Sequence, residues 1–451
     1  MTNGDSVRLS LLAINEVRDS LRNAIRAAYA TISVDGKIII ITSGNYNLPV
    51  VVGKTQIDCP ITKGYYSNSN QDSWKLKKDA RFRLWPKDSK YIDEGTFIYP
   101  IKQKWFANLT QSGNEPCYVN WGEDINNNKK IYYHSGHDIG GAEGLDMIIS
   151  ATDGLVISAN NKVLDNFDRS TIYVHPDAVS IMNERGWILE YAHLDSTFSS
   201  VKLGKHIKKG QKIGYVGKQG ESGGWVHLHF EIRNKEIPNG EWAIEDAYPY
   251  LWESYINQYR PKLIAVARPH HLVWTDQDVL LDGRKSKCFT GDIKSYEWTF
   301  TDGTKGEGAI QKKTYSKPGQ YSEILKVIDN KGNVDFDFAV VQVYDRENPK
   351  LLIPTIQAAF HPTMNLKPGT PITFLVRTFN TDIGNEVWDF GDGSCLVQVK
   401  SETVSRENPT NGKFAKTIHS FSKPGHYIAK IVRSNENGFR ALTHLHIEVK
   451  E

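Results

Sequence analysis

A five-residue stretch near the middle of the chain, His227-Leu228-His229-Phe230-Glu231, sets the strongest limit on the fold. In an extended strand, successive side chains point to opposite faces of a sheet. His227, His229 and Glu231 would therefore share one face, while Leu228 and Phe230 would point together into a core. This alternation predicts a β-strand that is apolar on one side and carries a cluster of titratable side chains on the other.

A second stretch, His134-Ser135-Gly136-His137-Asp138, looks like the other half of a metal site. If the stretch is extended, His134 and Asp138 share a face, and Gly136 between them has no side chain that would obstruct an ion. Two imidazoles and a carboxylate are a common ligand set for catalytic zinc and leave a fourth position for water. A lone His-x-His is usually not a metal site, but the two stretches together, with a third histidine at His193, favour one.

Other side chains near these stretches have two interpretations each. His137 would point to the strand face opposite Asp138, so we interpret it as structural rather than as a ligand. Glu231 either orients a site imidazole as a hydrogen-bond acceptor or forms a structural salt bridge.

The aromatic side chains that flank the two stretches are candidates for the cleft. Tyr132 and Tyr133 precede His134, and strand alternation places one of them at the cleft and the other in the core. Trp225 follows the glycine-containing loop 220–224, and together they would form a rim that grips a peptide, although a simple loop is the default interpretation.

The length of 451 residues exceeds what one hydrophobic core usually holds, so several domains are expected. The sequence predicts that residues 1–95 form a small mixed, mainly β domain, but it does not indicate the function of this domain. Residues 96–260 hold both histidine stretches. Residues 265–346 and 350–451 follow as two more domains, and the fold class is mainly β throughout.

Within the first two segments the patterns predict particular elements. A strand is expected at Val7–Leu11, and apolar residues at helical spacing predict an amphipathic helix from about 15 to 29. Asp35-Gly36 predicts a hairpin turn. Strands that alternate with glycine turns indicate a largely antiparallel domain over 96–260, which ends in a helix over about 243–257.

The last two segments look like a diverged tandem repeat. Trp298-Thr299-Phe300-Thr301-Asp302-Gly303 corresponds to Trp388-Asp389-Phe390-Gly391-Asp392-Gly393, and a Ser-Lys-Pro-Gly turn follows each. The Trp-to-Pro spacing is 20 residues (298 to 318) in the first copy and 36 (388 to 424) in the second. We place the extra residues in the polar loop near Ser401–Gly412, and many short strands predict two β-sandwiches.

Composition and charge exclude some classes of function. The net charge is only +3, and no block of Lys and Arg dominates any segment, so we expect no nucleic-acid partner. The sequence has no run of about 18 apolar residues, so we expect no transmembrane helix. The first residues lack the pattern of a signal peptide, and we expect a mature form whose leader is absent from this sequence.

Four cysteines are scattered along the chain with no C-x-x-C pair. They are too few for a disulfide scaffold and do not form a metal cluster. Cys59 and Cys117 could pair if the N-terminal half brings them together, but buried free thiols are the expected state.

Residues 130–235 closely resemble the lysostaphin-type zinc endopeptidases. Five elements agree in order: His134-x-x-x-Asp138, the Asp153-Gly154 hairpin, Tyr191-Ala192-His193-Leu194, Lys208-Lys209-Gly210-Gln211-Lys212-Ile213-Gly214 and His227-Leu228-His229-Phe230-Glu231. The resemblance implies that His134, Asp138 and His229 bind Zn2+ and that His193 and His227 are the catalytic pair. It does not say which of the pair is the base and which stabilises the oxyanion.

Two departures from the family concern the cleft. Trp225-Val226 precedes the His-Leu-His, where the family usually has a small residue or proline. A glycine-rich segment, 140–144, follows Asp138, and its Glu143 either adds a charge near the cleft or is a solvated loop acid.

The tandem repeat resembles polycystic-kidney-disease-type (PKD) sandwiches, through Trp388-Asp389-Phe390-Gly391-Asp392-Gly393 and, more loosely, the first copy. Such domains commonly act as extracellular spacers or adhesive modules. We therefore expect a secreted zinc metalloendopeptidase, extracellular, periplasmic or at the cell surface, that cuts peptide cross-links of bacterial peptidoglycan. The alternatives are a zinc peptidase acting on extracellular proteins and a non-catalytic wall-binding or activator module. The sequence does not indicate the oligomeric state.

Overall fold

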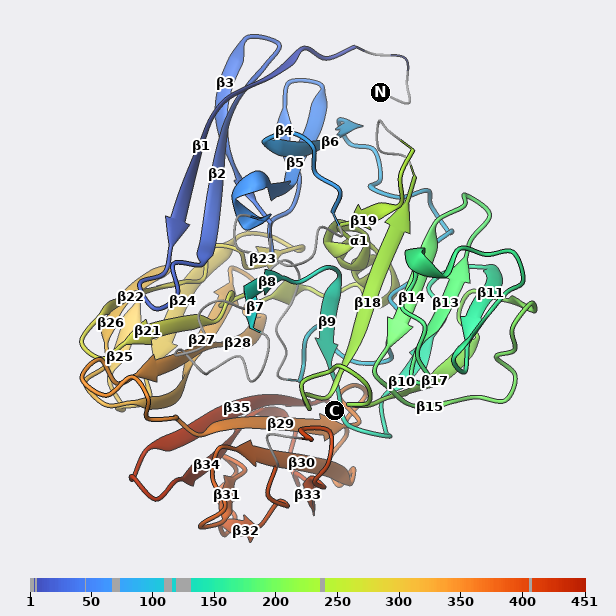
Figure 1. Cartoon of the computed structure of the whole chain (residues 1–451). Helices are drawn as coiled ribbons and strands as arrows, with labels where there is room; N and C mark the ends of the chain where they lie inside the picture. The colour runs from blue at the N-terminus through green and yellow to red at the C-terminus, as the bar shows by residue number, and fades with distance from the viewer. Residues whose placement is uncertain are drawn as a thin grey trace.

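The structure is a computed structural model, and it is mainly β, as the sequence predicts. It describes residues 4, 6–44, 46–66, 74–108, 116–118, 131–235, 240–404 and 408–451. Figure 1 shows the strand-rich architecture, with one α-helix among the described residues.

Two small antiparallel sheets, in the orders β1-β2-β3 and β4-β5-β6, form the N-terminal part. The strands are β1 (Leu9–Arg18), β2 (Ile25–Val34), β3 (Lys37–Ser43), β4 (Val50–Val52), β5 (Thr55–Thr62) and β6 (Ala80–Pro86), with a short 3-10 helix η1 (Lys63–Tyr66) after β5. The predicted hairpin turn is confirmed, because Asp35 and Gly36 both have positive φ angles and join β2 to β3.

The predicted helix over 15–29 is wrong, because β1 and β2 occupy this range as paired strands. The helical spacing of Val17, Leu21, Ala24 and Ala28 runs across the end of one strand, a turn and the start of the next. Residues of high strand propensity, such as Tyr29 and the Thr-Ile pair that follows it, pack in β2.

Residues 131–245 form one large antiparallel sheet in the order β12-β11-β13-β14-β18-β19, to which β9 and β16 add, and a second sheet β10-β17-β15. The elements are β8 (Ile131–Tyr133), which pairs with β7 (Pro116–Tyr118), then β9 (His137–Gly140), β10 (Met147–Ile149), β11 (Gly154–Ala159), β12 (Lys162–Val163), η2 (Arg169–Thr171), β13 (Val179–Met182), β14 (Ile188–Ala192), β15 (Leu194–Thr197), β16 (His206–Ile207), β17 (Lys212–Val216), β18 (His227–Asn234) and β19 (Ala243–Glu245). The pairings between these strands are antiparallel, as predicted.

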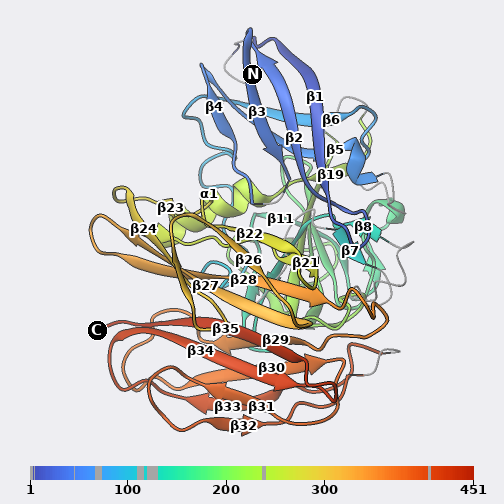
Figure 2. The same cartoon turned by 90° about the vertical axis from the view of Figure 1, so that its left-hand side faces the viewer.

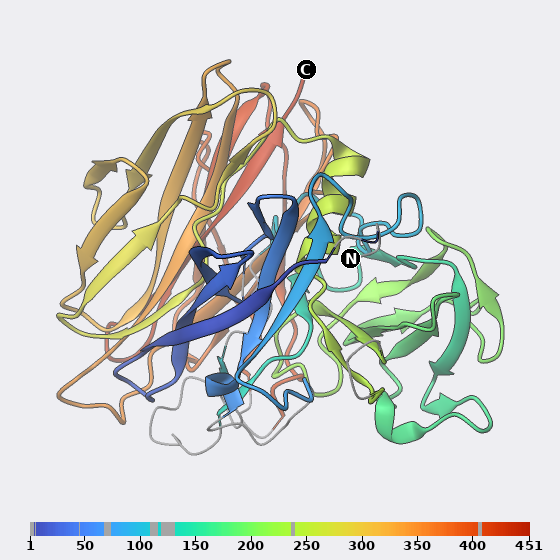
Figure 3. The ribbon, with the colours of Figure 1, turned by 90° about the horizontal axis from the view of Figure 1, so that it is seen from above.

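The helix after this sheet, α1 (Tyr248–Tyr259), begins later than predicted. Residues 243–245 pair with β18 as β19 and so cannot start the helix. Pro249 lies in its first turn, where a missing N–H costs no hydrogen bond. Viewed from above, α1 lies between the large sheet and the strands that follow it in the chain (Figure 3). Trp252 of α1 contacts Phe289, with ring centroids 6.1 Å apart.

Residues 263–449 form the remaining strands. They are β20 (Leu263–Ile264), β21 (His271–Trp274), β22 (Asp278–Asp282), β23 (Lys287–Cys288), β24 (Ile293–Thr299), β25 (Lys305–Glu307), β26 (Ile310–Thr314), β27 (Gly319–Asp329), β28 (Val334–Tyr344), β29 (Thr355–His361), β30 (Ile372–Phe379), β31 (Glu386–Asp389), β32 (Val397–Val399), β33 (Ala415–His419), β34 (Gly425–Ser434) and β35 (Arg440–Val449). Figure 2 shows three stacked layers: the N-terminal sheets in blue, the strands of the first repeat copy in yellow to orange, and those of the second copy in orange to red.

The two copies of the repeat share corresponding contacts. Trp298 and Trp388 are each almost fully buried at the corresponding position of the two cores. The Tyr321 hydroxyl donates to Lys317 O at 2.7 Å, and the Tyr427 hydroxyl donates to Lys423 O at 2.9 Å.

Parallel pairing of β27 with β35 joins the two copies into one nine-stranded sheet. The sheet β22-β26 packs on the part of it that belongs to the first copy, and the sheet β29-β30-β33 packs on the part that belongs to the second. These two packed pairs of sheets are called the first and the second sandwich.

Candidate active site

The site is built on the antiparallel pair of β9 and β18. In its register Asp138 lies opposite His229, and Gly140 lies opposite His227. Leu228 and Phe230 are fully buried in the main core, so the predicted alternation of β18 is confirmed. The histidines of β18 consequently point away from that core, toward the first residues of β9.

His134 reaches the site by a turn and not along a continuous strand. β8 ends at Tyr133 and β9 begins at His137, with Gly136 between them at φ +97°. The expectation that His134 and Asp138 share a face of one extended strand is therefore wrong, although the two side chains do meet. A Cβ at Gly136 would lie 2.9 Å from Phe230 O and 3.1 Å from the His229 ring, so the position needs glycine.

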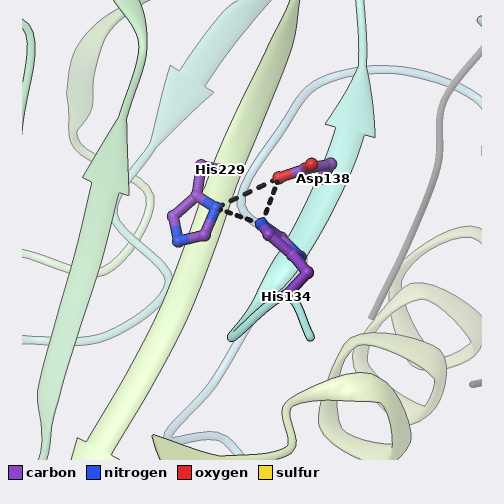
Figure 4. A group of neighbouring side chains, drawn as sticks. All are labelled: His134, Asp138 and His229. Atoms are coloured by element: carbon purple, nitrogen blue, oxygen red, sulfur yellow. Dashed lines mark hydrogen bonds and ion pairs between the residues drawn. The ribbon is translucent and has the colours of Figure 1, made fainter. Parts of the chain in front are cut away.

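Figure 4 shows that His134, Asp138 and His229 point toward one another. His134 Nε2 is 2.9 Å from His229 Nδ1 and 3.2 Å from Asp138 Oδ1, and His229 Nδ1 is 3.1 Å from the same oxygen. A tetrahedral zinc ion with bonds of about 2.0–2.1 Å holds its ligand atoms about 3.3 Å apart. Three nitrogen and oxygen atoms in a triangle of nearly this size fit zinc and leave one coordination position open.

Asp138 contributes a negative charge to this group. Burial alone would raise the pKa of Asp138, but the neighbouring His134 and His227 and hydrogen bonds to the site imidazoles hold that pKa well below its usual value. Asp138 is therefore an ionised carboxylate at neutral pH. Metal ligation requires this deprotonated form.

His193 follows β14 with φ +65°, a left-handed conformation that is uncommon outside glycine but that histidine adopts more often than most residues. Its Nδ1 lies 2.9 Å from Gln219 O and 3.3 Å from Asp177 Oδ2, and its backbone N–H donates to the same carboxylate oxygen at 3.0 Å. Because a carbonyl only accepts, Nδ1 carries the hydrogen, and Nε2 is left as the nitrogen that can accept a proton.

His227 is fixed in the same way. Its Nδ1 donates to Trp225 O at 2.9 Å, and its Nε2 lies 3.3 Å from Asp138 Oδ1. Burial lowers the pKa of His227 to about 3, against the opposing effect of the Asp138 charge, so the ring is neutral. The rings of His193 and His227 are 4.8 Å apart, and the ring of His193 is 5.8 Å from that of His229.

Glu231 and His137 lie next to this group with different roles. Glu231 Oε2 is 3.7 Å from His229 Nε2, and its other oxygen pairs with Arg233, so this carboxylate makes both interactions considered for it. His137 turns away and bonds Asp246 Oδ1 through Nε2 at 2.7 Å, which agrees with a structural role.

Of the aromatic candidates, the structure moves Tyr133 away from the cleft, while the place of the half-buried Trp225 at the rim stays a prediction. Tyr133 is 4% exposed, packs with Ile25 and Trp74 of the N-terminal part and accepts the Ile25 N–H at 2.6 Å, so it does not face the cleft. The side chain of Tyr132 lies outside the described residues. Trp225 stacks on Phe379 of the second sandwich, with ring centroids 4.9 Å apart.

Two further observations concern charge and thiols. Glu143 pairs with the buried Lys218 and so is not an isolated loop acid. Cys59 is a buried free thiol, and burial raises its pKa to about 12. The side chain of Cys117, its expected alternative partner, lies outside the described residues.

Sequence reasoning missed Asp177 and every contact from the second sandwich. Asp177 is buried and accepts from both the backbone and the ring of His193. A carboxylate sixteen residues before a histidine matches no spacing rule, and only the pairing of β13 with β14 brings the two together.

Comparison with known proteins matches residues 132–240 to Peptidase family M23 and residues 261–343 to the PKD domain. The chain carries an M23 peptidase domain followed by a PKD domain. The M23 match contains all five residues that the sequence assigns to ligation and catalysis.

Curated relatives are similar over only part of their length. Collagenase ColA of Clostridium perfringens is 24% identical over 263 residues, which are 48% of this chain and 23% of the collagenase. Cell division protein DipM of Caulobacter vibrioides is 35% identical over 86 residues, 19% of this chain and 12% of DipM. Murein hydrolase activator NlpD of Salmonella typhimurium is 34% identical over 106 residues, 24% of this chain and 26% of NlpD. The alignments thus span about a quarter or less of each relative.

Solved structures with similarity include the catalytic domain of the M23 protein EnpA from Enterococcus faecalis, at 26% identity over 25% of this chain and 75% of that chain, with a TM-score of 0.19. Csd3 of Helicobacter pylori is 18% identical over 55% of this chain and 82% of that chain, with a TM-score of 0.21. Within the described residues, no helix has the length and apolar character that crossing a membrane requires.

Proposed function

We propose that this protein is a zinc metalloendopeptidase that hydrolyses peptide bonds in bacterial peptidoglycan. The observation that carries the proposal is the His134–Asp138–His229 group, whose three ligand atoms lie within 3.2 Å of one another beside two further histidines. The M23 match over the same residues supports it.

The residues of the site would have the following roles. His134, Asp138 and His229 would hold Zn2+, which when bound supplies a Lewis acid for the scissile carbonyl and for a water molecule. His193 and His227 each fix Nδ1–H on a backbone carbonyl. Their Nε2 atoms can take a proton from the attacking water, donate one to the leaving amine or stabilise the oxyanion. Asp177 holds His193 in place through two hydrogen bonds.

Peptidoglycan is proposed as substrate because two of the relatives are named for cell division and for activation of murein hydrolases. The proposed location is outside the cytoplasm, where that polymer lies. Extracellular protein is the second candidate substrate, since the longest of these alignments is to a collagenase.

A non-catalytic activator is the third possibility, because NlpD bears that name. The presence of all three ligand residues and both neighbouring histidines in one site favours catalysis here.

The decisive experiment incubates the zinc-loaded full chain with purified bacterial walls of defined cross-link chemistry and, in parallel, with gelatin and casein. Mass spectrometry of released muropeptides is expected to show cleaved cross-links, which a chelator abolishes and added zinc restores. Cleavage of gelatin or casein without muropeptide release would support the protein substrate. Continued wall cleavage by verifiably zinc-free protein would overturn the mechanism.

A further inference from the structure

Both proposed catalytic histidines are held by one loop, residues 217–226, here named the bracing loop. The base of this loop is closed by the His227 N–H, which donates to Gly217 O at 3.1 Å. Gln219 O accepts from Nδ1 of His193, and Trp225 O accepts from Nδ1 of His227. The conformation of the bracing loop therefore sets the ring orientation and the protonated nitrogen of both histidines.

The bracing loop is not regular secondary structure. Three of its glycines, Gly220, Gly223 and Gly224, have φ between +60° and +83°, a region that glycine enters and leaves freely. Within the loop, Ser222 Oγ donates to Lys218 O at 2.6 Å and accepts from the Gly224 N–H at 3.1 Å. A segment with so much backbone freedom needs contacts from outside to keep two carbonyls in fixed positions.

Gln357 of β29, in the second sandwich, supplies one such contact. Its side-chain amide donates to Val226 O at 2.9 Å and accepts from Val226 N at 2.9 Å. Gln357 is 2% exposed and Val226 is fully buried, so water does not compete for this pair of bonds. The clamped residue lies between Trp225, whose carbonyl holds His227, and His227 itself.

Arg377 and Phe379 of β30 supply the other contacts. Arg377 donates to Gly224 O, to Pro409 O at 3.1 Å and to two more carbonyls of the 400–414 loop. Phe379 stacks on Trp225 with 12° between the ring planes. A Cβ at Gly224 would lie 2.2 Å from Pro409 O, so the loop and the sandwich are in close contact.

We propose that the second sandwich is a working part of the peptidase site, in which Gln357 is a positioning residue that acts on His193 and His227 through the bracing loop. The inference rests on the proposed function for its catalytic readout. Gln357 touches neither substrate nor metal ligand. It clamps Val226, the neighbour of Trp225, and so steadies the bracing loop, whose Gln219 and Trp225 carbonyls accept from Nδ1 of the two histidines.

The structure offers a control in Gln56 of β5. Its side-chain amide donates to Pro86 O at 3.0 Å and to Ser89 O at 2.9 Å. Gln56 is 7% exposed and belongs to the N-terminal part, not to the second sandwich. Gln357→Leu and Gln56→Leu thus each remove a buried amide that binds the backbone, and Gln357 is the one of the two that bonds the bracing loop.

The test compares kcat and KM of both variants of the full zinc-loaded chain on wall fragments, with zinc content and thermal unfolding measured alongside. Gln357→Leu is expected to lower kcat by about 10- to 100-fold with zinc content unchanged. Gln56→Leu is expected to lower thermal stability to a similar degree while kcat stays within about twofold. Equal kcat for the two variants, or loss of zinc in Gln357→Leu, would overturn the proposal.

A second readout does not depend on activity. Long-range proton–nitrogen spectra of histidine-labelled, zinc-loaded protein are expected to show His193 and His227 protonated at Nδ1 in the parent and in Gln56→Leu. Gln357→Leu is expected to show mixed tautomers at both rings. Unchanged tautomers in Gln357→Leu would refute the positioning role. If the parent chain cleaves no wall, mixed tautomers in Gln357→Leu would still uphold the positioning role, while the proposed function would be refuted.

Discussion

At the scale of single residues, the site separates histidines that look alike in sequence. His229 and His137 both lie on the β9–β18 pair, but His229 points to Asp138 and His137 points to Asp246. Strand alternation is enough to predict this difference, because one face of β18 is apolar and the other is polar. It is not enough to place His134, whose approach depends on a left-handed glycine at Gly136.

Replacing a proposed ligand tests the metal group directly. His229→Ala is expected to lower zinc affinity by more than about 100-fold, because one of three protein ligands is removed. His137→Ala is the matched control, and it is expected to lose stability while keeping zinc affinity within about tenfold. Competition against a chromophoric chelator measures both values. Parent-like zinc affinity in His229→Ala would contradict the ligand assignment.

The turn glycine gives a second test at this scale. Gly136→Ala is expected to destabilise the fold by about 1–3 kcal/mol and to weaken zinc binding, since the new methyl group meets Phe230 O and the His229 ring. Gly186→Ala shares the positive φ but has no atom within 4 Å of its Cβ, so it isolates backbone strain from the steric clash. Urea unfolding with zinc titration measures both effects. Equal behaviour of the two variants would show that the clash has no consequence.

At the scale of elements, the sequence predicts strands where one face is apolar and fails where apolar spacing crosses a turn. β18 and the β2–β3 hairpin are confirmed because alternation and the Asp35-Gly36 turn chemistry agree with the tertiary structure. The helix expected over 15–29 fails because four apolar residues at helical spacing belong to two strands. Local periodicity carries no information on where a chain reverses.

Glu386 of β31 and Arg433 of β34 form a fully buried ion pair, which leads to a prediction at this scale. Burial would raise the pKa of Glu386, but hydrogen bonds from Ser401 and the charge of Arg433 outweigh burial and lower it. Since the folded pKa lies below the unfolded value of about 4.3, the pair stabilises the sandwich above that value. The stabilisation is lost as pH falls from about 4.3 through the folded pKa.

Glu386→Gln is therefore expected to destabilise the second sandwich at pH 7 by about 3–5 kcal/mol and to flatten its pH dependence below about pH 4.3. Hydrogen exchange of peptides that cover β31, measured from pH 7 to pH 3, follows the change. Glu297→Gln is the control, since its ion pair with Lys326 is partly exposed to solvent. An unchanged acid limb in Glu386→Gln would exclude this carboxylate as a source of acid lability.

At the scale of the whole molecule, the contacts that complete the site come from segments that no local pattern connects. Gln357 and Val226 are 131 residues apart in sequence, and Asp146 bonds His361 across 215 residues. The tandem repeat predicts two sandwiches, but it does not predict that the second one packs on the bracing loop. Such packing depends on surfaces that exist only after both domains have folded.

Three parts of the chain meet at one ion cluster, and this cluster gives the last prediction. Lys104, which precedes the M23 domain, bonds Asp335 of β28 at 2.7 Å and lies 3.1 Å from His446 of β35. Burial would raise the pKa of Asp335, but the Lys104 charge and His446 together hold it below its usual range, so the carboxylate is ionised. Removing the lysine would leave that charge buried without its cation, which costs about 3–5 kcal/mol.

The cluster joins both sandwiches to the segment around Lys104, which is bridged to β10 of the M23 domain at Ile101. We therefore expect the parent chain to unfold in one cooperative calorimetric transition and Lys104→Met to unfold in two. Lys326→Met is the control, because its ion pair with Glu297 is partly exposed and lies within one sandwich. Wall cleavage by Lys104→Met should fall in parallel, since a loosened second sandwich no longer holds the bracing loop through Gln357. A single parent-like transition in Lys104→Met would show that the domains are coupled by their apolar contacts and not by this cluster.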